Sequence, residues 1–339
     1  MTSYRPLSSA LLSLDITFAN IRLRFTREQG MLLIFLFHSL FENKKEAQSG
    51  VMDPQQGITV EMFRTMVRYF RAQSHSFVSP DQIAEGLPSE GKYVLLTFDD
   101  GYHNNVRALP VLEEFNAPAV FFISSNHVKC NKSFWWDSVY REGKKRGCPD
   151  AEIGRTIVSY KMHKTEDVEA NLKETFGKNA LRPIGDLDRP FTPSELCDFA
   201  NHPLVFLGNH TRDHAILRNY HREEINYQIC QAQNDILEMT GHTPKMIAYP
   251  SGFESESIRR TAERAGLRLG VGIQPGHNPL RSNNESWDRM ALKRFTLWSD
   301  LGIEQQCLSS RSSFSIHQQL QGLRRIVARR PFYFAGSTR

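Results

Sequence analysis

Paired cysteines are missing from this chain of 339 residues. Its five cysteines are odd in number, and no two of them have the Cys-x-x-Cys spacing of a redox or zinc motif; they are Cys130, Cys148, Cys197, Cys230 and Cys307. This pattern excludes a disulfide framework and a cysteine-rich zinc site, and it favours a reducing compartment.

Long apolar runs are also absent. The segment Met31–Phe37 is apolar for only seven residues, whereas a membrane-spanning helix needs about 20. Residues 1–30 carry Asp15 and scattered arginines and lack the uninterrupted apolar core of a signal peptide. We therefore expect a soluble, cytoplasmic protein.

The sequence has little excess of positive charge, and that excess lies at one end. There are 42 basic and 37 acidic residues, and residues 321–339 contain five arginines and no acidic residue, which leaves 37 against 37 elsewhere. Such a tail could contact an anionic membrane surface or a lipid-linked phosphate, or it could be disordered and merely solubilising. No basic stripe occurs in the main body, so we do not expect nucleic-acid binding.

Seven short apolar segments separated mostly by helical patterns are present instead. This alternation predicts an α/β fold with a parallel sheet, closed or nearly closed as a barrel. We expect strands at 31–37, 93–98, 119–123, 204–207, 246–249, 267–272 and 292–297. Residues 127–200 interrupt the rhythm and predict an inserted helical cap. The predicted organisation is an N-terminal extension over 1–30, one barrel domain over 31–300, and a C-terminal extension over 301–339.

Two adjacent carboxylates, Asp99 and Asp100, stand where the second of these strands should end, followed by Gly101. Burying two uncompensated carboxylates is unfavourable, so such a pair indicates a cation or a shared proton. A solvated Asp-Asp-Gly turn is the alternative that this stretch leaves open.

A second polar group, His210 and His214, also follows a predicted strand. Histidines four residues apart on a helical turn or tight loop can bind one metal ion, and in an α/β barrel all strand ends face one pocket. Thr211 stands where a zinc protease would need its glutamate, so a protease is excluded. Two imidazoles and one carboxylate with an open position predict a catalytic divalent-metal site, most naturally zinc.

The segments Thr97–Tyr102 and His210–His214, in this order, resemble the first two motifs of the polysaccharide deacetylases, also called carbohydrate esterase family four. The resemblance implies a distorted (β/α)7 barrel and metal-dependent removal of an N-acetyl group from an amino sugar. By position, Asp99 would be the general base, and Asp100, His210 and His214 the metal ligands. Tyr249–Gly252 resembles the third motif, so Tyr249 and Pro250 would form a wall and the Ser251 N–H would stabilise the oxyanion.

The sequence departs from the family pattern in three places. Ala248 stands where an arginine should orient the catalytic aspartate, and Arg294 is our candidate substitute. The acidic fourth motif is not present as such, and Trp287-Asp288 is only loosely similar to it. The general-acid histidine of a Leu-x-His motif is not found convincingly near the C-terminus, but Leu36–His38 ends the first strand. A circularly permuted subset of the family has this arrangement, so we assign His38 as the general acid.

The cluster Phe134-Trp135-Trp136 either stacks on sugar rings or anchors the cap to the barrel. Together with Tyr102 of the first motif, Trp135 is therefore a candidate for the substrate wall. We expect an N-deacetylase in surface-polysaccharide or glycolipid synthesis, acting on a polymer or on a nucleotide- or lipid-linked sugar. A metal-dependent amidase on a non-sugar C–N bond and a carbohydrate-binding pseudoenzyme are the alternatives.

Overall fold

The computed structural model describes residues 17, 19, 23, 30–280 and 288–312. Most of the predicted N-terminal extension, Trp287 and the whole basic tail from residue 321 lie outside these residues. Among the described residues, no helix has the length and apolar character needed to cross a bilayer.

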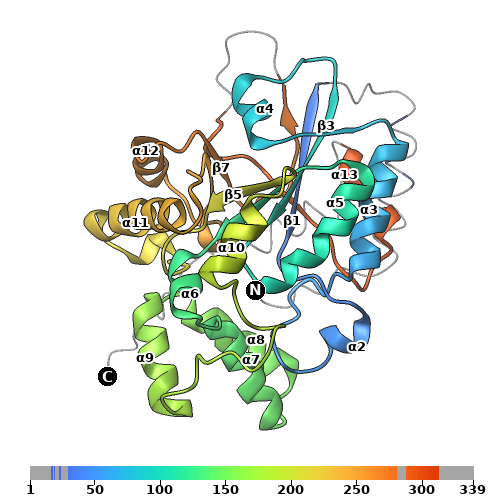
Figure 1. Cartoon of the computed structure of the whole chain (residues 1–339). Coiled ribbons are helices and arrows are strands. Elements are labelled where there is room, and N and C mark those ends of the chain that lie inside the picture. The colour runs from blue at the N-terminus through green and yellow to red at the C-terminus, as the bar shows by residue number, and fades with distance from the viewer. Residues whose placement is uncertain (1–16, 18, 20–22, 24–29, 281–287, 313–339) are drawn as a thin grey trace, which may run out of the picture.

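A curled sheet forms the centre of the molecule, and all seven predicted strands belong to it (Figure 1). They are β1 (Met31–Phe37), β3 (Lys92–Phe98), β4 (Ala119–Ile123), β5 (Val205–Asn209), β6 (Met246–Ala248), β7 (Leu269–Val271) and β9 (Phe295–Thr296). They are parallel in the order β7-β6-β5-β4-β3-β1, and β9 pairs with β1. A parallel bridge between Val271 and Leu292 joins β7 to the segment that leads into β9, so the barrel closes at this seam. Two shorter strands, β2 (Ser76–Phe77) and β8 (Asn278–Pro279), pair with β3 and β1.

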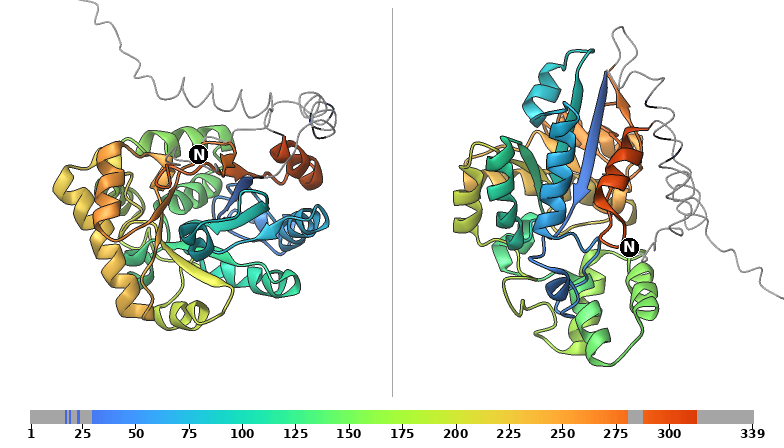
Figure 2. Two further views of the ribbon diagram at one scale, coloured as in Figure 1. Left: turned by 90° about the horizontal axis from the view of Figure 1, so that it is seen from above. Right: turned by 90° about the vertical axis from the view of Figure 1, so that its right-hand side faces the viewer.

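Most helices cover the outside of this barrel, as the two views in Figure 2 show. The barrel helices are α3 (Val60–Ala72), α4 (Pro80–Glu85), α5 (Leu109–Phe115), α6 (Ser125–Cys130), α10 (Pro193–Ala200), α11 (Arg222–Thr240), α12 (Glu256–Arg264) and α13 (Ile303–Arg311). Helix α3 has Thr59 as its N-cap, whose side chain accepts a hydrogen bond from the Met62 N–H. Pro110 stands in the first turn of α5, where its missing N–H needs no partner.

Side chains alternate along the strands between two apolar cores. In β1, Leu33, Phe35 and Phe37 pack outward against α3, whereas Leu32 and Ile34 face the barrel interior with Leu95 of β3. Counting two residues at a time from these inward-facing positions leads to His38 just after β1 and to Asp99 just after β3. The pleat of the two strands therefore directs both side chains into the barrel mouth.

The predicted cap is present as three helices, α7 (Trp135–Lys145), α8 (Asp150–Tyr160) and α9 (Thr165–Phe176), joined by the short helix α2 (Lys44–Ala47) from another part of the chain. They share an apolar core of their own that includes Phe134, Trp136, Ile153 and Leu172. Figure 2 shows that β1 points its carboxyl end toward this group of helices. Helix α10, although inside the predicted insertion, packs into the barrel core through Leu196 and Phe199.

Candidate active site

A pocket lies between the carboxyl ends of the strands and the cap. Its lining side chains come from five strand ends, from the loop between α2 and α3, and from α7 and α8: they are His38, Asp53, Gln55, Asp99, Asp100, Trp135, Trp136, Ile157, Lys161, His210, His214, Ser251 and Ile273. All six predicted catalytic and metal-binding residues are in or next to this pocket, since Arg294 contacts Asp99 directly.

The two aspartates share the pocket because the backbone leaves the strand geometry between them. Asp99 still belongs to the ladder, and its N–H donates to the Phe37 carbonyl at 2.9 Å. Asp100 has a φ of +80°, which is rare for a residue with a side chain and which ends the alternation of the strand. Gly101 follows at φ +89°, and a Cβ there would lie 3.1 Å from Ile123, so the turn favours glycine.

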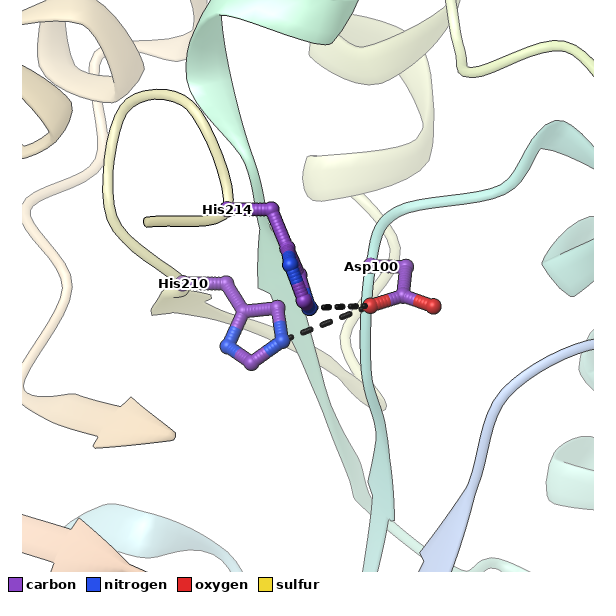
Figure 3. A group of neighbouring side chains, drawn as sticks. All are labelled: Asp100, His210 and His214. Carbon is purple, nitrogen blue, oxygen red and sulfur yellow. Dashed lines mark ion pairs between the residues drawn. The ribbon is translucent and has the colours of Figure 1, made fainter. Parts of the chain in front are cut away.

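Asp100, His210 and His214 converge on one point (Figure 3). The Asp100 Oδ1 atom lies 3.4 Å from His210 Nε2 and 3.3 Å from His214 Nε2. All three side chains are buried, and Oδ1 has no hydrogen-bond partner among the described residues. Ligand atoms of a tetrahedral ion with bonds of about 2.0–2.1 Å would be separated by about 3.3–3.4 Å, so the three atoms fit a shared divalent ion.

The polar contacts of this group also fit a metal ion. The His210 Nδ1–H donates to the Ala248 carbonyl at 2.7 Å, which leaves Nε2 facing Asp100. Burial opposes the charge of this imidazole, but Asp99 and Asp100 outweigh it and raise the pKa of His210, so a metal ion would displace a proton from Nε2. Burial lowers the pKa of His214 to about 4, and this imidazole is therefore neutral at pH 7. Burial opposes the charge of Asp100, but the close contacts with His210 and His214 hold the pKa of this carboxyl well below its usual value. Neutral imidazole and ionised carboxylate are the forms that bind metals.

The loop that carries the two histidines is held by its own polar groups. The Thr211 N–H donates to Asn209 Oδ1 at 2.8 Å, and the Ala215 N–H donates to Thr211 Oγ1 at 2.8 Å. Thr211 and His214 have φ values of +61° and +50°. These left-handed residues fold the loop so that both imidazoles face the same point, and such backbone geometry is typical of functional sites.

Arg294 takes the place that the sequence predicted for it. It is fully buried, and its guanidinium forks onto Asp99 with Nη1–Oδ1 at 2.7 Å and Nη2–Oδ2 at 2.8 Å. It also donates to the Gly272 carbonyl at 2.7 Å and to Thr97 Oγ1 at 3.1 Å. Burial opposes the charge of Asp99, but the guanidinium outweighs it and holds the pKa of Asp99 below its usual value.

His38 enters the pocket from β1, next to the strand that carries Asp99. It is 7% exposed, and its Nδ1 lies 2.8 Å from the Gln56 side-chain oxygen. Because β1 pairs with both β3 and β9, it occupies the place in the barrel that the permuted arrangement requires. The C-terminal histidine His317 lies outside the described residues.

The predicted substrate wall is only partly at the pocket surface. Ser251 lines the pocket with a φ of +57°, and Trp135 lines it from α7. Tyr102, Tyr249 and Pro250 are buried and do not line it. Tyr102 donates to Asp137 Oδ2 at 2.7 Å, so it joins the first motif to the cap instead of contacting a ligand.

The aromatic cluster serves as an anchor and also reaches the pocket. Phe134 stacks on Trp136 at 4.7 Å between ring centroids, and the Trp136 N–H donates to the Tyr102 hydroxyl at 3.0 Å. Trp136 also packs against His214, with ring centroids 4.5 Å apart. The cap is thus fixed to the barrel beside the proposed metal ligands, while Trp135 and Trp136 form part of the pocket wall.

Asp53, Gln55, Gln56 and Lys161 belong to the site although sequence reasoning missed them. The first three come from the loop between α2 and α3, and Lys161 ends α8. No motif marked them, because their proximity to the strand ends depends on how a loop and a cap fold over the barrel. The sequence contains one signal of the contact between this loop and the cap. Asp137 is an acidic residue directly after three aromatic residues, and it accepts a hydrogen bond from the Asp53 N–H.

The sequence is similar to those of known polysaccharide deacetylases. A family model for polysaccharide deacetylases matches residues 86–270, more than half of the chain. A Bacillus subtilis protein described as a polysaccharide deacetylase, YxkH, is 24% identical over 257 residues, which are 74% of this chain and 67% of the relative. The matched model range contains Asp99, Asp100, His210, His214 and Ser251, whereas β1 and Arg294 lie outside it.

Solved structures of deacetylases share the fold. Polysaccharide deacetylase BC0361 of Bacillus cereus has a TM-score of 0.56 at 14% identity, over 83% of this chain and 69% of that protein. Streptococcus pyogenes deacetylase PplD, solved with acetate, has a TM-score of 0.54 at 15% identity, over 82% and 96%. A de-N-acetylase of Aggregatibacter actinomycetemcomitans has a TM-score of 0.53 at 15% identity, over 80% and 97%.

Proposed function

This chain belongs to the polysaccharide deacetylase family, and we propose that it is a metal-dependent enzyme that removes N-acetyl groups from an amino sugar. The observation that carries the proposal is the buried group of Asp100, His210 and His214 beside the Arg294–Asp99 ion pair. These residues combine a metal site and an ionised base in one pocket.

A divalent ion, most naturally Zn²⁺, would be held by Asp100, His210 and His214 and would supply Lewis acidity toward the acetyl carbonyl and the attacking water. Asp99 is held ionised by Arg294, and it accepts a proton from that water as the water attacks the carbonyl carbon. The Ser251 N–H donates to the carbonyl oxygen as negative charge develops there, an interaction that typically contributes about 3 kcal/mol. His38 then gives a proton to the departing amine nitrogen.

The substrate is an acetylated carbohydrate, and we propose a place for it in surface-polysaccharide or glycolipid synthesis. In this proposal the reaction is cytoplasmic and acts on a nucleotide- or lipid-linked sugar. The basic tail would add peripheral contact with an anionic membrane. Co-sedimentation with anionic vesicles tests this membrane contact. We expect the full chain to co-sediment and a version lacking residues 321–339 to stay in solution.

The amidase alternative uses the same group of residues on a non-sugar C–N bond, and the pseudoenzyme alternative keeps the fold without turnover. The pocket keeps both carboxylates and both histidines, and Arg294 takes the place of the motif arginine. This complete set argues against loss of catalysis. No observation in the described residues favours a non-sugar amide.

One experiment separates these readings. Bound metal and acetate release are measured on a panel of N-acetylhexosamine substrates for the wild type and for Asp99→Asn. We expect bound metal in both proteins and acetate release only by the wild type, since Asp99 moves a proton and is not a ligand. A folded wild-type protein that binds no divalent metal contradicts the metal-dependent mechanism, and metal without turnover on any sugar favours the alternatives.

A further inference from the structure

The Nδ1 atom of His38 contacts the side chain of Gln56, a residue that no sequence motif indicates. His38 Nδ1 lies 2.8 Å from Gln56 Oε1, and the other end of the same amide, Nε2, donates to the Leu36 carbonyl at 2.6 Å. Gln56 is 3% exposed, so both contacts are shielded from water. A buried amide with both ends engaged has one orientation.

That orientation determines which nitrogen of His38 carries a proton. A carbonyl such as that of Leu36 can only accept, so the amide nitrogen of Gln56 must face it and the amide oxygen must face His38. The amide oxygen can also only accept, so His38 Nδ1 carries hydrogen. Nε2 is then the nitrogen left to exchange a proton in the pocket.

The loop holds Gln56 in place from several sides. The Ser299 N–H donates to the Gln56 carbonyl at 3.0 Å, and the Gly57 N–H donates to the Pro54 carbonyl at 2.7 Å. The Asp53 N–H donates to Asp137 Oδ1 of the cap at 3.0 Å. Gln56 is therefore positioned by the barrel, by its own turn and, through Asp53, by the cap.

We propose that Gln56 is a positioning residue that holds His38 in the Nδ1–H tautomer and leaves Nε2 to protonate the departing amine. This inference rests on the proposed function, in which His38 is the general acid. A neutral amide accepts from Nδ1–H both before and after Nε2 gives up its proton, and it stabilises the imidazolium less than a carboxylate would. The titratable side chains that line the same pocket are Asp53, Asp99, Asp100, Lys161, His210 and His214.

Two substitutions test this role. Gln56→Met keeps the length of the side chain but provides neither contact, and Gln56→Glu keeps an acceptor for Nδ1–H. Gln48→Leu, at an exposed position just after α2, is the matched control. All proteins are first compared by urea unfolding so that only folded variants are interpreted.

The first readout is the ¹⁵N NMR signature of the His38 ring, identified by its loss in His38→Gln. We expect Nδ1–H in the wild type, in Gln48→Leu and in Gln56→Glu, and a mixture of tautomers in Gln56→Met. The second readout is acetate release from a pentamer of N-acetylglucosamine. For Gln56→Met we expect kcat to fall about 10- to 100-fold with KM nearly unchanged, as for other residues that orient a functional histidine.

Unchanged Nδ1–H and a kcat within twofold of the wild type in folded Gln56→Met would overturn the proposal. If Gln56→Met does not fold, loss of the Nδ1–H signature in Gln56→Glu overturns it, and retention supports it. If the wild type releases no acetate, the proposed function fails on this substrate, but the NMR signature still decides whether Gln56 sets the tautomer.

Discussion

Replacing Arg294 by methionine removes the cation that pairs with Asp99 and leaves the proposed metal ligands unchanged. The substitution removes both hydrogen bonds to Asp99 and the bonds to Gly272 and Thr97. It also leaves the Asp99 carboxylate buried with its principal counter-charge gone. Breaking a buried ion pair in this way costs about 3–5 kcal/mol of unfolding free energy.

That loss is large compared with the total stability of about 5–15 kcal/mol that folded proteins have. Arg64, which pairs with Glu61 and Glu114 near the surface, provides a matched control. Its replacement by methionine should cost less than about 1 kcal/mol, because exposed ion pairs contribute little. Urea unfolding of both variants at pH 7 measures the difference.

The same substitution should change the pH dependence of activity. In the wild type the pKa of Asp99 is lowered, because Arg294 outweighs the effect of burial. The stability that this pair contributes is present above the unfolded pKa of about 3.9 and is lost as pH falls through the folded pKa. Without Arg294, burial dominates and the pKa of Asp99 rises, so the acidic limb of kcat/KM should move to higher pH.

The double variant Asp99→Asn, Arg294→Met distinguishes charge from packing. With both charges removed, it should recover part of the stability lost in Arg294→Met but none of the activity. If Arg294→Met keeps wild-type stability and an unchanged acidic limb, Arg294 does not hold Asp99 ionised and our account of the base is wrong.

Three further predictions concern the metal site, the cap and the pocket wall. Dipicolinate should remove the divalent ion, abolish acetate release and lower Tm, with full recovery on adding Zn²⁺, because an ion bound only by the folded state stabilises it; full activity in metal-free protein would exclude the metal role. Burial raises the pKa of Asp137 well above its usual value, so the folded protein binds a proton more tightly there than the unfolded chain, and stability falls as pH rises from about 4 through the folded pKa. The stability of Asp137→Asn relative to the wild type should therefore increase with pH between 5 and 9 by up to about 1.4 kcal/mol per pH unit in urea unfolding, and a constant difference would contradict a protonated Asp137. Trp135→Phe should raise KM for N-acetylhexosamine oligomers more than it lowers kcat, and unchanged KM would show that the indole makes no contact with the sugar.

The sequence was sufficient to predict the barrel strands, because buried parallel strands are short runs of apolar, mostly β-branched or aromatic residues. The sequence was less informative about the segment 292–297, which joins β7 to β1 where the barrel closes. Residues 292–297 were expected as one strand, but only Phe295 and Thr296 pair with β1, while Leu292 bridges to β7. A segment that bridges two strands at its opposite ends cannot run in full register with either, and no periodicity reveals that.

The site residues that follow strands could be predicted for a similar reason. A strand end has a fixed place in a barrel, so Asp99, Asp100, His210 and His38 were expected at one mouth before any contact was known. Arg294 could be proposed because a buried aspartate needs a cation and this arginine stands near the last strand. Tyr249 was misplaced as a wall, since its ring turns inward and packs against Gly270, where a Cβ would lie 2.7 Å from the hydroxyl oxygen.

Residues on loops lack such a fixed place, and Gln56 illustrates the consequence. Its turn is determined by a Ser299 contact from the far end of the chain and by an Asp137 contact from the cap. Neither contact is local, so the sequence around residue 56 carries no trace of them. The Asp137 contact nevertheless connects this turn to the cap, so the proposed general acid His38 is linked to the cap through Gln56 and Asp53. In our proposal the proton donor is therefore positioned by a loop that a motif search does not detect.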